Sequence, residues 1–461
     1  MPTNANISSI EEAKAFLEKH NIDTIRVGAV DLDGLWRGKQ FGAEYFLNSV
    51  VENGTNIANV LFGWDVEDEV VEGLAYTNWE TGYPDIKLIP DLTTLRLIPW
   101  EPRVASVICE MVEMDMTPVV LSPRNILRKA VEKANAMGYQ PKAAYEFEFY
   151  LFEGSIADMA EGDYRTLRPA RRAGHTYSML HYATSDDLFG QLRRYIQEAG
   201  LTIEATISEH GPGQFEFNLE YDDALAAADG ALFAKYAVKE LATQNGMTAC
   251  FMAKPNAAWS GSSGHMHMSL SDMDGNPLFN NAEDPLMLSD LGLSFLAGMK
   301  ENSRIMSAIY QPNVNSYKRT MNVGAWAAAN SSWGIDNRTV SFRAIPSKGP
   351  AARIENRIPG ADTNPYLVIA ASLLCGLKGV ETGMDAGEPF KGNAYRATPE
   401  QATPLASSLE EAAHLFADSP MVRELFGEEF VDHYVRMKRW ELLRMNSKVT
   451  DWELNRYLEV I

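Results

Sequence analysis

The chain has 461 residues, 46% of them hydrophobic and 22% charged, which is the composition of a globular protein with a sizeable core. Its formal net charge is −21 and it has no basic stripe, so we expect no nucleic-acid partner. The polar amino terminus lacks a signal-peptide pattern, and the apolar stretch 366–377 is too short to cross a bilayer. Together with three widely separated cysteines, these features predict a cytoplasmic protein without a membrane partner.

The first part of the chain alternates short extended segments with turns, which is the pattern of a small sheet. Residues 25–30 predict a strand that ends at an Asp- and Gly-containing turn. The segment 122–137 is amphipathic and begins with Ser-Pro, which suits a helix start because serine caps helices and proline is tolerated in their first turn. We therefore predict two domains, 1–121 and 122–461.

The second part mixes strands with helices, and the acidic helices near its end are expected at the periphery. This order predicts an α+β fold in which a largely antiparallel sheet carries the functional site. The predicted strands are 146–152, 203–208, 214–219 and 265–270, and the predicted helices are 186–198, 224–245, 408–417 and 421–443.

The densest chemical signal is the segment Tyr-Glu-Phe-Glu-Phe-Tyr at 145–150. Successive side chains of a strand point to opposite faces, so Phe147 and Phe149 should pack in the core while Glu146 and Glu148 share the other face. Two carboxylates that close repel each other unless a cation lies between them. The segment therefore predicts a metal site.

Further metal-type ligands follow along the chain. Glu209 and Glu216 flank a Gly-Pro-Gly turn, His265 and His267 share one strand face, and Glu355 lies further on. Read alone, the first pair also fits a hairpin with exposed carboxylates, and the histidines fit a hydrogen-bonded pair. Five carboxylates and an imidazole form an oxygen-rich set that suits Mg²⁺ or Mn²⁺. Two or more ions are expected, because six ligands exceed what one ion with open positions needs, and paired divalent ions typically clamp a phosphoryl group during transfer.

Several arginines gather after these ligands. Guanidinium groups are planar, bidentate donors that recognise phosphates and carboxylates. Any single one is more often a surface residue, but a group of them predicts an anionic substrate that carries phosphate and carboxylate groups. The arginines are Arg319, Arg338, Arg343, Arg353 and Arg357.

From about residue 20 onward the chain resembles the glutamine synthetase family, in particular its γ-glutamyl-amine ligase branch. The resemblance implies a small β-grasp-like amino-terminal domain and a large catalytic domain, built on a curved antiparallel sheet with helices outside. The motifs that carry it are Glu146-Phe147-Glu148, Glu209 with Gly211-Pro212-Gly213-Gln214-Phe215-Glu216, Gly264-His265-Met266-His267-Met268-Ser269, Asn315-Ser316-Tyr317-Lys318-Arg319, Asp336-Asn337-Arg338 and Arg353-Ile354-Glu355-Asn356-Arg357.

The resemblance also implies roles for single residues. The ligands implied for a first metal ion are Glu148, Glu209 and Glu216. Those implied for a second ion, which holds the nucleotide phosphates, are Glu146, His265 and Glu355. Contacts to the nucleotide are implied for Glu204, His267, Ser269, Arg343 and Arg353. Contacts to glutamate and the transferring phosphate are implied for Gly261, Arg319, Arg338 and Arg357, the arginines being catalytic.

The reaction of the family is an ATP-dependent ligation. It implies that ATP phosphorylates the γ-carboxylate of glutamate and that an amine displaces phosphate from this γ-glutamyl phosphate, with two to three Mg²⁺ or Mn²⁺ ions per site. The resemblance further implies a homo-oligomer, commonly a dodecamer of two hexameric rings, in which neighbours share active sites. Tyr395 lies where some members carry an adenylylated tyrosine.

Two departures from the family concern the amine. The amino-terminal Asp-Gly-Ser-Ser segment is replaced by a segment with Trp64 and Asp65, and the glutamate of the Gly-Tyr-Glu flap is replaced by Trp326 in Gly324-Ala325-Trp326. Indole removes an ammonium site and offers an apolar surface. We therefore predict an alkyl or aromatic amine, such as isopropylamine or aniline, held by both tryptophans, with Asp65 as a candidate for deprotonating it.

Four alternatives stay open. Ammonia as the acceptor would make the protein a glutamine synthetase. A γ-glutamylpolyamine or γ-glutamylethanolamine synthetase is another alternative, and the acids after Trp64 could hold the distal charge of a polyamine. A phosphotransferase related to guanidino kinases would form ADP without an amide. A catalytically silent scaffold is disfavoured because all six expected metal ligands are present.

Overall fold

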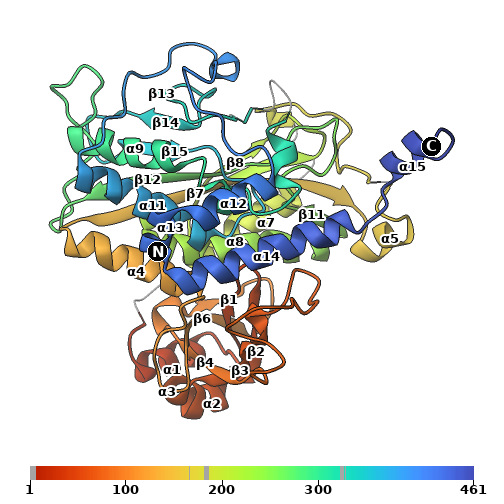
Figure 1. The fold of residues 1–461 in the computed structure, drawn as a ribbon. Coiled ribbons are helices and arrows are strands. Elements are labelled where there is room, and N and C mark those ends of the chain that lie inside the picture. Colours follow the sequence, from red (N-terminus) through yellow and green to blue (C-terminus); the bar gives the residue numbers. More distant parts are fainter. Residues whose placement is uncertain (1–6, 166, 181–185, 322–325, 328) are drawn as a thin grey trace.

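The computed structural model describes residues 7–165, 167–180, 186–321, 326–327 and 329–461. A small part formed by the first strands lies below a large part formed by the rest of the chain, as the red and orange ribbon in Figure 1 shows. The carboxyl-terminal helix projects from the side of the large part (Figure 1).

The small part is a mixed sheet with a helix against it. In this sheet β1 lies between β2 and β6; it runs parallel to β6, and the other pairings are antiparallel. Helix α1 (Ile10–Lys19) begins at a capping box in which Ser9 and Glu12 each bond the other's backbone N–H. The strands are β1 Thr24–Val30, β2 Trp36–Gly42, β3 Thr55–Ala58, β4 Asp85–Pro90, β5 Arg96–Leu97 and β6 Val104–Val112.

The large part is built on a nine-stranded sheet in the order β13-β14-β15-β12-β7-β9-β8, with β10 and β11 also paired to β7. All its pairings are antiparallel except that of β13 with β14. The long β7 begins before the predicted segment 146–152. The strands are β7 Gln140–Glu153, β8 Ile203–Ser208, β9 Gln214–Leu219, β10 Asp222–Asp223, β11 Met247–Cys250, β12 Gly264–Ser271, β13 Trp333–Ile335, β14 Phe342–Ile345 and β15 Arg353–Asn356.

Helices cover this sheet. Helix α11 is long and apolar enough to cross a membrane, but 78% of its apolar window is buried in the protein, so it serves as a core helix. The α-helices found after α1 among the described residues are α2 Ala43–Tyr45, α3 Val51–Asn53, α4 Pro123–Ala136, α5 Ile156–Glu161, α7 Asp186–Glu198, α8 Ala224–Gln244, α9 Asp290–Asn302, α10 Ser307–Tyr310, α11 Pro365–Thr382, α12 Leu409–Asp418, α13 Pro420–Phe426, α14 Glu428–Asn446 and α15 Asp451–Tyr457.

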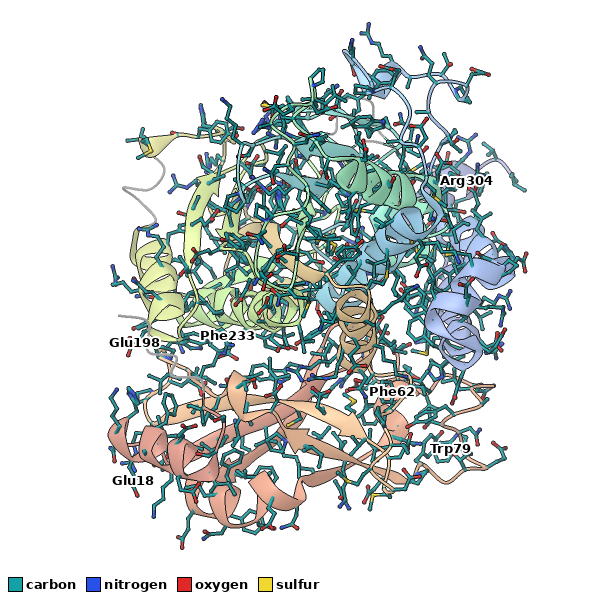
Figure 2. The ribbon with its side chains drawn as sticks, turned by 90° about the vertical axis from the view of Figure 1, so that its left-hand side faces the viewer. Glu18, Phe62, Trp79, Glu198, Phe233 and Arg304 are labelled. Atoms are coloured by element: carbon teal, nitrogen blue, oxygen red, sulfur yellow. The ribbon has the colours of Figure 1, made fainter. Side chains whose placement is uncertain are left out.

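Aromatic and ionic contacts join the two parts. Phe233 of α8 lies on the lower side of the large part (Figure 2), where its ring centroid is 5.4 Å from that of Trp100 and the Arg96 guanidinium lies 5.2 Å from it. The Arg124 side chain is 2% exposed; it donates to both carboxylate oxygens of Asp229, at 2.9 and 2.8 Å, and to Asp91 at 2.8 Å. Charged side chains of the two parts therefore form ion pairs with each other in the interface.

The α+β fold with a largely antiparallel sheet is confirmed, and most predicted segments agree with the structure to within a residue or two. The predicted helix 421–443 is wrong in one respect, because it is divided into α13 and α14. Gly427 separates them with a φ of 85°, a conformation in which a Cβ atom would be strained. The predicted boundary after residue 121 stays a prediction.

Candidate active site

The site begins with the two-residue alternation of β7. Phe147 and Phe149 are fully buried on one face, whereas Glu146 and Glu148 lie half-buried on the other. This is the arrangement that the sequence predicts. The aromatic face packs on further rings, with Phe149 stacked 5.3 Å from Phe251. The core therefore fixes the strand that presents the two carboxylates.

Cross-strand register gathers the other ligands around them. Glu148 pairs with Glu216 of β9, Glu146 pairs with His265 of β12, and His267 pairs with Glu355 of β15. Glu209 follows β8 and lines the same cavity, of about 450 Å³. The six predicted metal ligands thus meet on one face of the sheet.

One half of this cluster contains histidines. His267 Nε2 lies 3.0 Å from Glu146 Oε1, and His265 Nδ1 lies 3.4 Å from Glu146 Oε2 and 3.5 Å from Glu355 Oε1. Ligand atoms of Glu146, His267 and Glu355 all lie within 4.8 Å of one another. His267 is therefore a further candidate ligand for the ion predicted to be held by Glu146, His265 and Glu355. Among the described residues, buried His265 Nε2 has no hydrogen-bond partner, which leaves it available to a metal.

The pKa values in this half are low. Burial alone would raise the pKa of Glu146, but the nearby His267 and His265 outweigh it and hold the pKa well below its ordinary value. Burial likewise opposes ionisation of Glu355, but Arg357, His265 and His267 lower its pKa to about 2. Both carboxylates are therefore ionised at neutral pH.

The other half contains carboxylates alone. Burial, and then repulsion by Glu148, raises the pKa of Glu209 to about 8. Burial and the three neighbouring glutamates raise the pKa of Glu216 well above its ordinary value. These acids hold protons unless a cation replaces them, so their chemistry fits a divalent ion.

Arginines complete the cavity. Arg338, Arg343 and Arg357 line it, and Arg343 Nη1 donates to Glu355 Oε2 at 3.0 Å while Arg357 pairs with Glu355 Oε1. Arg319, which is predicted to contact glutamate and the transferring phosphate, does not line this cavity. It is 1% exposed and donates to Ser263 Oγ at 3.0 Å and to the Ile358 carbonyl.

A second cavity, of about 230 Å³, lies beside the first one, and Glu146 and Asn218 line both. Arg353 Nε donates to His267 Nδ1 at 3.2 Å in this second cavity. It contains four of the predicted nucleotide contacts; only Arg343 lies in the first cavity instead. The four are Glu204, His267, Ser269 and Arg353.

The predicted amine residues are divided between two places. Trp326 is 55% exposed and lines the acid cavity, as does Gly261, whereas Gly324 and Ala325 lie outside the described residues. Trp64 and Asp65 belong to a loop of the small part and do not line this cavity. One chain therefore does not bring the two tryptophans together.

Sequence reasoning missed several residues of the cavities. Tyr177 and Ile207 line the acid cavity, and the exposed Tyr221 lines the second one. Gln214 belongs to the family motif at residues 211–216, but the sequence did not predict its buried hydrogen bonds to Glu148 and Gly261. Tyr221 could have been found as an aromatic five residues after Glu216, whereas the segment around Tyr177 carries no motif.

Carboxylates, histidines and arginines on one sheet face define a site suited to divalent cations and an anionic substrate. The sequence model of the glutamine synthetase catalytic domain matches residues 120–457. The chain therefore belongs to the glutamine synthetase family, and the resemblance seen in its motifs is confirmed.

Relatives within the family add detail. A glutamate–isopropylamine ligase from a Pseudomonas species is 59% identical over 456 residues, which are 99% of each chain. A γ-glutamylethanolamide synthetase from Streptomyces coelicolor is 38% identical over 450 residues, covering 98% of this chain and 96% of that protein. A solved complex of GmaS with ADP superposes with a TM-score of 0.85 at 28% identity, covering 96% of this chain and 98% of the other. The predicted glutamine synthetase-like fold is thereby confirmed.

Proposed function

We propose that this protein is an ATP-dependent ligase that joins the γ-carboxylate of glutamate to an organic amine. The products would be a γ-glutamylamide, ADP and phosphate, formed through γ-glutamyl phosphate. The observation that carries this proposal is the meeting of two cavities at Glu146. A nucleotide in one cavity and a carboxylate in the other would face each other across that residue, as phosphoryl transfer requires.

The second cavity is proposed to hold ATP. Arg353 offers donors to phosphate, Ser269 a hydroxyl and Glu204 a carboxylate, and His267, which lines the same cavity, accepts from Arg353 Nε and so orients that guanidinium. Tyr221 is 58% exposed there and offers a ring on which a base can stack. The GmaS–ADP structure supports this assignment, because that protein has the same fold with a bound adenine nucleotide.

The acid cluster is proposed to hold two or three Mg²⁺ or Mn²⁺ ions. Glu148, Glu209 and Glu216 would hold one ion, because Glu209 and Glu216 have pKa values raised by burial and by neighbouring carboxylates, a condition that a bound cation would relieve. Glu146, His265 and Glu355 would hold another, with His267 beside them. Bound divalent ions neutralise phosphate charge and polarise phosphoryl oxygens. The protein supplies the arginines and the fixed orientation of the carboxylates.

Glutamate is proposed to lie in the acid cavity beside Gly261. Arg338 and Arg357 line this cavity and offer bidentate donors to a carboxylate and to the transferring phosphate. Their fixed positive charge would stabilise the negative charge that develops on the phosphoryl group. Arg319 is assigned a supporting role, because its guanidinium is already bonded to Ser263 and Ile358.

The acceptor is proposed to be an alkyl or aromatic amine, such as isopropylamine or aniline. Trp326, Tyr177 and Ile207 give the acid cavity an apolar side against which such a group can pack. The name of the 59% identical relative supports isopropylamine in particular. Ethanolamine is a second candidate, because the 38% identical relative is a γ-glutamylethanolamide synthetase.

The loop with Trp64 and Asp65 is proposed to serve the active site of a neighbouring subunit, because it does not line the cavity of its own chain. This supports a homo-oligomer, and we propose a dodecamer of two hexameric rings that is located in the cytoplasm. Sedimentation velocity would measure the mass of the assembly, and a monomer with full activity would contradict shared sites.

Phosphate release tests the proposed function. Protein with ATP, Mg²⁺ and glutamate is assayed with ammonium, isopropylamine, aniline, ethanolamine and putrescine in turn, and products are identified by mass. Release stimulated by isopropylamine or aniline, with the matching γ-glutamylamide, supports the proposal. Release stimulated mainly by ammonium identifies a glutamine synthetase instead, and ADP without an amide identifies a phosphotransferase.

A further inference from the structure

Gln214 is a buried polar side chain at the junction of three segments of the acid cavity. It is the first residue of β9, directly after the turn Gly211-Pro212-Gly213, and it is 3% exposed. Its Oε1 accepts from the backbone N–H of Gly211 at 2.8 Å. The Tyr150 hydroxyl lies 3.4 Å from the same oxygen and donates its proton to the Ser260 carbonyl at 2.8 Å. Its Nε2 donates to Glu148 Oε2 at 3.2 Å and to the Gly261 carbonyl at 2.8 Å. One amide therefore uses both its acceptor and its donors.

These bonds fix the orientation of the Glu148 carboxylate. Glu148 Oε2 accepts from Gln214 Nε2 and also from the Ser263 backbone N–H at 2.8 Å. With this oxygen held on two sides, the other oxygen of Glu148 is directed to the cavity. Arg319 supports the same arrangement from behind, through its bond to Ser263 Oγ.

The same amide holds the loop before β12 in place. The Gly261 carbonyl accepts from Gln214, and a Cβ atom at Gly261 would lie 2.3 Å from Arg319 Cγ, so the loop is packed tightly on both sides. The turn on the other side of Gln214 is equally close. A Cβ atom at Gly211 would lie 2.0 Å from the Tyr150 hydroxyl oxygen.

We propose that Gln214 is a positioning residue that sets the metal-binding carboxylate Glu148 and the glutamate loop at Gly261 in one fixed arrangement. The inference rests on the proposed function, because it takes Glu148 as a metal ligand and Gly261 as a glutamate contact. Only an amide can do this here. A carboxylate lacks the donors for Glu148 and Gly261, and an apolar side chain bonds neither of them nor the Gly211 N–H. The nucleotide cavity does not include Gln214, so ATP binding should be independent of it.

Two variants of the full-length protein test the proposal. Gln214→Glu keeps the shape of the side chain and an acceptor for the Gly211 N–H. It replaces the amide donor by a carboxylate oxygen, which repels Glu148 Oε2. Gln214→Met removes all polar contacts without adding charge. Mn²⁺ binding is measured by electron paramagnetic resonance without substrates, and KM values for glutamate and ATP are measured separately. We expect Mn²⁺ affinity to fall about 10- to 100-fold, as for other residues that orient metal ligands. The KM for glutamate should rise, and that for ATP should stay within about twofold.

Gln191→Glu is the matched control. Gln191 lies on α7 and accepts from Asn245 Nδ2 at 3.1 Å, a role that a carboxylate retains, and it lines neither cavity. It carries the same change of charge, so Mn²⁺ affinity and both KM values should equal those of the unmodified protein. Thermal melting of all variants shows whether they are folded.

The outcomes separate the two proposals. Unmodified protein that binds no Mn²⁺ contradicts the proposed metal site, and this inference with it. Mn²⁺ binding that is equal in folded Gln214→Glu, folded Gln214→Met and unmodified protein overturns the inference alone. A parallel rise of the glutamate and ATP KM values, in a variant with unchanged Mn²⁺ affinity, would also overturn it by indicating a general structural effect.

Discussion

The two halves of the acid cluster use the same side chain in opposite electrostatic conditions. Glu146 and Glu355 have histidines or an arginine beside them, and their pKa values lie below the ordinary range. Glu209 and Glu216 have other carboxylates beside them, and their pKa values are raised. The first half is therefore charged before any metal arrives, whereas the second half needs a metal to become charged. Whether a buried carboxylate in such a cluster is ionised before metal binds therefore depends on the histidine and arginine side chains beside it.

Removing a ligand from the carboxylate-only half should have the largest effect. Glu148→Gln keeps the size of the side chain and its bond to the Ser263 N–H but replaces a charged ligand by a neutral one. We expect turnover to fall at least about 100-fold with little change in thermal stability. Glu153→Gln, at the exposed end of the same strand, is the control. Normal turnover of Glu148→Gln at saturating Mg²⁺ would refute the ligand assignment.

The next largest effect is expected for the apolar residues of the acid cavity, through the selection of the amine. Trp326→Ala removes an indole from the acceptor side, and we expect kcat/KM for isopropylamine to fall about 10-fold relative to that for ammonium. The matched control is Trp79→Ala, because Trp79 is 73% exposed on the small part, away from the cavity (Figure 2). An equal loss for both amines would show that Trp326 does not select the acceptor.

Thermal stability should depend on pH with opposite signs in the two halves. The folded pKa of Glu209 is about 8, above its ordinary 4.5, so its proton stabilises the metal-free fold below about pH 4.5, and this contribution is lost as pH rises through 8. Glu355, with a pKa of about 2, loses its contribution as pH falls from 4.5 towards 2. Melting in chelator should therefore show Tm falling between about pH 5 and 8, and saturating Mg²⁺ should remove this fall. A chelated protein whose Tm does not fall over that range would contradict the raised pKa.

The smallest effect is expected at Asp65. Its Oδ1 accepts from the N–H groups of Glu67 and Glu69, and its Oδ2 accepts from Trp440 Nε1 at 2.9 Å. Asp65→Asn retains the first two bonds and loses only the third, so we expect kcat to fall less than about 10-fold. A general base would cost about 100-fold or more. A loss of that size, measured at saturating amine, would identify Asp65 as the base that deprotonates the amine.

Local sequence patterns predicted most of the site because they obey short-range rules. The alternation of Glu146 with Phe147 follows from strand geometry alone, and the motifs around Glu209 and His265 lie on the strands expected for them. The register of β12 against β7 and β15 is long-range and could not be deduced from the sequence, and it brings His267 into the metal group. The burial of Arg319 and the bonds of Gln214 depend on loops that fold back from distant positions. The break at Gly427 was detectable, since glycine is a poor helix former.

Arg124 has a consequence for how the molecule unfolds. It lies just after the predicted boundary at residue 121, yet its buried guanidinium binds Asp91 and Glu110 on one side and Asp229 on the other. Deleting the small part would remove Asp91 and Glu110 and leave the Arg124 guanidinium with Asp229, which belongs to the large part. It would also expose to water a guanidinium that is 2% exposed in the complete protein, together with the Phe233 ring that packs on Trp100. A truncated protein that begins near residue 122 is therefore expected to be less stable than the complete chain.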